Sequence, residues 1–101
     1  MGSRLELQTV LEELLGSRNV YYQPPASVLM KYPAIVYSRD DIANTFADNR
    51  VYMQVTAYMV TVIDKNPDSE IVTKVSQLPM CSFERHYVSD NLNHDVFTLY
   101  F

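Results

Sequence analysis

The sequence contains one cysteine, two glycines and no tryptophan in 101 residues. A single cysteine excludes a disulfide within the chain and is compatible with a reducing compartment. Gly2 and Gly16 alone cannot form the glycine-rich loops that cradle phosphates. No apolar run approaches the ~18 residues of a membrane span, and the N-terminus lacks the basic-then-apolar pattern of a signal peptide. We therefore expect a protein that is made in the cytoplasm, stays soluble and has no membrane partner.

Basic residues are also few, because eight Lys and Arg stand against twelve Asp and Glu, for a net charge of −4. They are scattered, whereas a nucleic-acid clamp normally shows a basic stripe. With 48% hydrophobic residues the chain can bury a modest core, and its length predicts one domain spanning residues 1–101. Eight tyrosines against four phenylalanines favour half-buried strand faces and protein interfaces.

Residues that could perform chemistry do not form a recognisable pattern. Cys81, His86 and His94 are the only soft metal ligands, and their spacing matches no zinc site. Cys81 and His86 are expected on opposite faces of one strand, which also disfavours a Cys–His nucleophilic pair. The aspartates of the acidic segment 40–48 lack the spacing of a calcium loop. We predict no enzyme activity, no cofactor and no metal site.

The longest uninterrupted strand signal is Tyr52–Ile63, which has no glycine, proline or charge. At about 3.4 Å per residue it would reach about 40 Å, whereas the radius of gyration of such a domain is near ~13 Å. The strand should therefore protrude, bend or be covered by another subunit. Alternation assigns Met53, Val55, Ala57, Met59, Thr61 and Ile63 to the core, and Tyr52, Gln54, Thr56, Tyr58, Val60 and Val62 to the other face. Of the second face, Tyr52, Gln54, Thr56 and Tyr58 are candidates for contact with a neighbouring subunit.

The remaining pattern predicts two helices and further strands around this one. We expect a helix between Ser3 and Gly16, strands at 19–23 and 33–39, a helix capped by Asn66 and ended by Pro79, and strands at 80–88 and 96–101 that form a hairpin. The fold class is α+β: a largely antiparallel sheet of four to five strands with two helices on one face, in the order α-β-β-β-α-β-β.

The polar segment between the strands at 33–39 and 52–63 is predicted to be a long loop. Loops of this length in small domains are usually functional or mobile. Because it carries both charge signs, we regard it as a candidate contact surface, with a solvated connection as the alternative. The candidate residues are Arg39, Asp40, Asp41, Asp48, Asn49 and Arg50.

Several segments resemble small tail-region proteins of long-tailed bacteriophages, in particular the tail terminator (tail completion, or head–tail joining) family. They are YPAIVYSRDD (32–41), ADN (47–49), VTVIDKNPDS (60–69), LPMCSFER (78–85) and SDNLNHDVFTLYF (89–101). The resemblance implies an α+β protomer that closes into a hexameric ring at the head-proximal end of the tail tube. The implied partners are other copies of the chain, the tail tube protein and the neck or connector protein of the head. DNA would only pass through the bore, and no catalytic residues are implied.

Two alternatives remain open at the level of sequence. The first is a head-completion or stopper protein of the phage neck. The second, of another class, is a cytoplasmic ligand-binding or regulatory domain of ferredoxin-like build.

Overall fold

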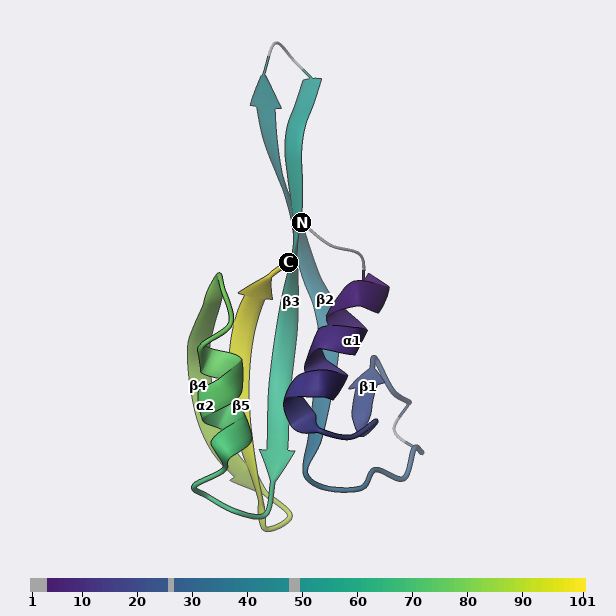
Figure 1. The fold of residues 1–101 in the computed structure, drawn as a ribbon, viewed down its shortest axis with the longest axis vertical. Coiled ribbons are helices and arrows are strands. Elements are labelled where there is room, and N and C mark those ends of the chain that lie inside the picture. The colour runs from purple at the N-terminus through teal and green to yellow at the C-terminus, as the bar shows by residue number, and fades with distance from the viewer. Residues whose placement is uncertain (1–3, 26, 48–49) are drawn as a thin grey trace.

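The computed structural model describes residues 4–25, 27–47 and 50–101, which form two helices and five strands (Figure 1). The elements are α1 (Arg4–Leu15), β1 (Val20–Tyr22), β2 (Ala34–Ala47), β3 (Arg50–Asp64), α2 (Glu70–Ser76), β4 (Cys81–Ser89) and β5 (Leu92–Tyr100). The predicted α+β class and the order α-β-β-β-α-β-β are confirmed.

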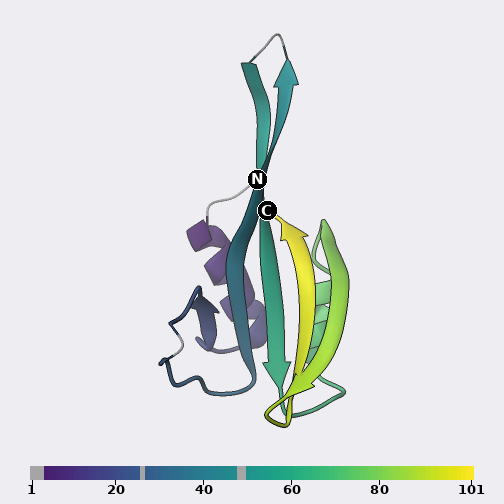
Figure 2. The same cartoon turned by 180° about the vertical axis from the view of Figure 1, so that it is seen from behind.

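The strands form one sheet in the order β1-β2-β3-β5-β4. β1 runs parallel to β2, and every other neighbouring pair is antiparallel. Both helices cover the same face, as the front and back views show (Figures 1 and 2). Over the other face of the sheet, the described residues place no helix.

Helix α1 ends where the sequence predicts. Leu7 and Leu11 are fully buried against the sheet, on the stripe expected from their spacing. Gly16 adopts φ +80°, and its N–H donates to the carbonyl of Glu12 at 2.9 Å, which closes the helix. Ser3, the predicted N-terminal cap, lies outside the described residues.

Helix α2 is shorter than predicted, because its cap is Ser69 and not Asn66. The Ser69 hydroxyl accepts from the N–H of Ile71, whereas the Asn66 side chain accepts from the N–H of Asp68 at 3.0 Å in the preceding turn. Asparagine competes for local backbone groups in this way, and here the turn takes precedence over the cap. Val75 is buried and joins α2 to the core.

The core lies between the helices and the sheet. Its buried members are Leu7, Leu11, Val20, Ile35, Tyr37, Tyr58, Val60, Val62, Val75, Phe97 and Leu99. The predicted facing of β3 is therefore wrong in this region, because Tyr58, Val60 and Val62 point under the helices. Met59 is 38% exposed on the opposite face, where Ala57 and Ile63 are nevertheless buried. Both faces of β3 carry apolar residues, so alternation alone did not distinguish them.

The predicted loop 39–50 is also wrong, because β2 continues to Ala47 and pairs with β3 along this length. Ile42 lies opposite Thr56, and Asn44 lies opposite Gln54. Cross-strand pairing thus overrides a polar composition that disfavours strands. The two strands run past the rest of the sheet as a protruding hairpin (Figures 1 and 2), and the longest dimension of the molecule is 51 Å. We call residues 41–47 and 50–56 the arm.

The predicted C-terminal hairpin is confirmed, with a tighter turn than expected. β4 and β5 are joined by Asp90 and Asn91, whose φ values of 53° and 62° are those of a type I′ turn. Phe97 and Leu99 are buried on one face, and Phe101 packs against the same core cluster.

Three register shifts change which residues share a face. One falls at Asp40 in β2 and one at Glu84 in β4; the third lies in the arm between Thr45 and Phe46, where Tyr52 of β3 is the extra residue. Each inserts an extra residue, which reverses the alternation beyond it. In β4, Phe83 therefore pairs with Phe97 and Arg85 with Val96, so the two side chains lie on different faces of the sheet.

Candidate functional site

The arm is the part of the molecule best placed to contact another chain. Within the described residues, its two strands pair with each other and with no further strand, since β5 meets β3 only from Ala57 and β1 meets β2 only at 35–37. At the base, the N–H of Phe101 donates to the carbonyl of Thr56 at 3.0 Å. Beyond it, the outer edges present backbone donors and acceptors that can pair with a strand from another chain.

The predicted contact residues fall in four different environments. Arg39 and Asp40 are exposed at the base of the arm, and Thr56 is half-buried there. Tyr58 is 5% exposed within the core, so its assignment as a contact residue is wrong. Asp41, Arg50, Tyr52 and Gln54 lie in the arm strands, where only the backbone is described, and Asp48 and Asn49 lie outside the described residues.

Tyr58 belongs instead to a cluster of tyrosines beneath α1. The ring of Tyr37 lies 6.0 Å from that of Tyr58 and 4.9 Å from that of Tyr22. The Tyr37 hydroxyl donates to the Oε1 atom of Gln8, and Arg4 lies over the Tyr22 ring at 4.6 Å. The high tyrosine content was expected on half-buried strand faces and at protein interfaces, whereas Tyr37 and Tyr58 are buried in the core.

Burial raises the pKa of Tyr37 and of Tyr58 above the usual value of 10.0. A raised pKa means that the folded chain holds these phenol protons more tightly than the unfolded chain. The resulting stability is fully present below about pH 10, the ordinary tyrosine pKa, and is lost as the pH rises through the folded-state values.

We therefore expect the free energy of unfolding to fall steeply above about pH 10. Urea denaturation at several pH values measures this directly. Tyr58→Phe should flatten the dependence because it removes one buried phenol, whereas Tyr100→Phe, which alters a 39% exposed residue, should not. Equal flattening by both variants would contradict the assignment of Tyr58 to the core.

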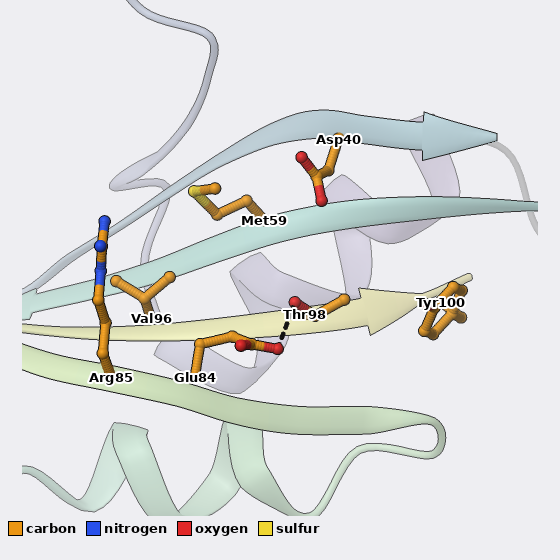
Figure 3. A pocket seen from close by; sticks show the side chains of 7 residues that line it. All are labelled: Asp40, Met59, Glu84, Arg85, Val96, Thr98 and Tyr100. Atoms are coloured by element: carbon orange, nitrogen blue, oxygen red, sulfur yellow. Dashed lines mark hydrogen bonds between the residues drawn. The ribbon is translucent and has the colours of Figure 1, made fainter.

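The face without helices carries a shallow groove of about 490 Å³. It is lined by Asp40, Met59, Glu84, Arg85, Val96, Thr98 and Tyr100 (Figure 3). The register shifts at Asp40 and Glu84 place Asp40 on one rim of the groove and Glu84 on the other. The Thr98 hydroxyl donates to the Glu84 carboxylate at 2.8 Å. The groove has an apolar floor and charged rims, and its lining contains neither histidine nor cysteine. Such a groove is suited to binding another molecule through surface contacts.

The β4–β5 hairpin contains Cys81 and His86 in β4 and His94 in β5. His86 Nδ1 lies 2.8 Å from Asp95 Oδ1, and the His94 ring stacks on Tyr87 at 4.6 Å. Burial raises the pKa of the Cys81 thiol, which lowers its reactivity. The expectation that Cys81 and His86 lie on opposite faces is wrong, because their partners Leu99 and Asp95 are four residues apart on β5.

Over residues 4–25, 27–47 and 50–101, no three His, Cys, Asp or Glu side chains are grouped to hold a metal ion. In the same part of the chain, no helix is long and apolar enough to cross a membrane.

Comparison of the chain with protein-family models, with curated proteins and with solved structures finds no match in any of the three. Function is therefore inferred from the sequence and from the geometry of the arm, the groove and the sheet edges.

Proposed function

We propose that this chain is a bacteriophage virion protein that forms a ring at the head-proximal end of the tail tube. There it ends tube polymerisation and joins the tail to the head. The segments that resemble the tail terminator family suggest this role. The observation that carries it is the arm, which projects from the body without a partner of its own.

An isolated two-stranded hairpin is at best marginally stable in water. The arm is such a hairpin beyond the last residue of β5, because its strands pair only with each other in the described structure. A second chain that pairs with one of its edges would stabilise it. We infer that the arm is an assembly element, and that the working form of the protein is an oligomer.

The arm differs in structure from the rest of the protomer's surface, so a contact between it and the body of another copy is heterologous. Heterologous contacts produce rings when the rotation closes and open filaments when it does not. A terminator requires the closed form, which we propose to be hexameric. Its two faces would then contact the tail tube protein on one side and the neck or connector protein on the other.

The charge and the proposed location agree with this role. A net charge of −4 disfavours adhesion of DNA, so the genome can pass through the bore of the ring. The protein would assemble in the host cytoplasm and remain at the head-proximal end of the tail in the virion. Neither an enzymatic step nor a cofactor is part of the proposal.

Light scattering of the protein, alone and with tail tube protein, tests the proposal. We expect an oligomer of one defined mass and tubes whose length is limited when the protein is present. A strictly monomeric protein that neither binds tubes nor limits their length would refute it. Phage that lack the protein should carry overlong tails; leaking heads with normal free tails would instead indicate a stopper of the neck.

A further inference from the structure

Strand β4, like the arm, has a backbone edge that pairs with no other strand in the described structure. It pairs with β5 on one side and forms the outer edge of the sheet on the other (Figure 1). Every one of its residues after Cys81 is exposed to solvent. An edge strand that leaves both faces and one backbone edge in water favours a further partner.

The side chains of β4 also favour contact with a partner. Phe83 is 55% exposed, Tyr87 41% and Val88 62%, although all three are large and apolar or aromatic. Phe83 and Val88 lie on one face of the strand and Tyr87 on the other, because their partners Phe97 and Asn93 share a face of β5 and His94 does not. Exposed apolar side chains on both faces of an edge strand favour contact with a partner.

The directions of the strands define how a second copy could continue the sheet. Three successive antiparallel pairings make β4 antiparallel to β2. If neighbouring copies point the same way, as a ring requires, β2 of the next copy can add antiparallel to β4 and preserve the alternation. β1 occupies the outer edge of β2 only at residues 35–37, so the arm part of that edge is open.

We propose that β4 of one copy pairs with the arm strand of β2, residues 41–47, of the next copy. This inference rests on the proposed ring and names the contact that would close it. Charge selects the register: Asp41 is the one charged residue of that arm strand, and Arg85 is its counterpart of opposite sign on β4. Antiparallel pairing of Asp41 with Arg85 places Ala43 opposite Phe83.

The register also has the geometry of a closed barrel. Arg85 lies level with Val36 through the pairs with Val96 and Thr61. Asp41 pairs with Ala57, which lies four residues from Thr61 on β3, because Asp40 is the extra residue of a register shift. Four residues correspond to about 14 Å along the strand, and the four strand spacings to the next copy's β2 correspond to about 19 Å. The resulting strand tilt of about 35° lies at the lower end of the range of closed barrels, about 35–45°.

Disulfide cross-linking of the full chain tests the contact. In a Cys81→Ser background, Ala43→Cys combined with Phe83→Cys should give, on oxidation, a ladder of covalent oligomers that ends at one closed size. The matched control replaces Ala43→Cys by Lys65→Cys, an exposed position at the other end of β3, and should give no ladder. Covalent dimers from Phe83→Cys alone would indicate a symmetric β4–β4 contact and overturn the inference.

A charge-reversal pair gives a second readout that does not depend on cysteine. Arg85→Asp should weaken assembly, and addition of Asp41→Arg should restore it; failure of the second change to restore it would contradict the register. If rings form but the cross-link between Ala43→Cys and Phe83→Cys does not, this inference is overturned and the proposed function stays intact. Cross-linked rings that do not limit tube length support the inference and overturn the function.

Discussion

The variant Tyr58→Asp is expected to lose most or all of its folded population at neutral pH. Tyr58 is 5% exposed in the core and packs near the Tyr37 ring, so the change removes a buried aromatic ring and inserts a carboxylate. Loss of a buried aromatic alone costs about 3–5 kcal/mol, and an unpaired buried charge costs more. Small domains are stable by about 5–15 kcal/mol, so the change removes a large part of the total. Circular dichroism with urea denaturation measures it.

Met59→Asp is the matched control, one residue away on the opposite face. Because Met59 is 38% exposed, its replacement should change the free energy of unfolding by about 1 kcal/mol or less. The reverse result, a stable Tyr58→Asp and an unfolded Met59→Asp, would mean that the two faces of β3 are assigned the wrong way round.

Removal of the arm is expected to abolish assembly and leave the protomer folded. The change replaces residues 43–55 by Asn-Gly, which joins Ile42 to Thr56, a directly opposed pair in the hairpin. Asn-Gly favours the type I′ turn that connects two strands most tightly. The buried core cluster described for residues 4–25, 27–40 and 56–101 is kept in full, so the unfolding transition should remain cooperative. Light scattering should then report the mass of one chain.

The control for this deletion replaces only residues 48 and 49 by Asn-Gly, which keeps both arm strands at full length. This variant should assemble like the parent chain. An armless chain that still forms the same oligomer would show that the arm is not the contact. An armless chain that is unfolded would show that the arm belongs to the folding unit.

The end of α1 and the C-terminal hairpin were predictable because short-range chemistry specifies them, although the hairpin turn is tighter than expected and the cap of α2 was assigned to the wrong residue. The leucine spacing of α1 and the positive φ of Gly16 define one helix, and the Asp90–Asn91 turn defines the C-terminal hairpin. These signals depend on residues within a few positions of one another. Tertiary context changes them little.

The faces of β3 were not predictable from alternation, because both faces carry apolar side chains along this strand. The pairing of Val60 with Tyr37 and with Phe97 determines the buried face, and it is known only once the sheet is assembled. The register shifts at Asp40 and Glu84 add a second uncertainty. Each reverses the alternation beyond it, and no sequence signal in β2 or β4 announces it.

The β2 half of the arm escaped prediction for a related reason, whereas the strand at 52–63 was expected to protrude, bend or be covered by another subunit. The segment 40–49 is rich in aspartate and asparagine, which disfavour strands, so its composition indicates a loop. The strand conformation of residues 40–47 comes from pairing with β3. Arg39 and Asp40, two of the predicted contact residues, are exposed at its base, and their role in a contact stays a prediction.

Electron microscopy of the purified protein, alone and added to polymerising tail tube protein, tests the proposed ring most directly. We expect closed rings of one diameter, and tubes that stop growing with a ring at one end. Single protomers without rings, together with tubes whose length does not depend on the protein, would contradict the proposal.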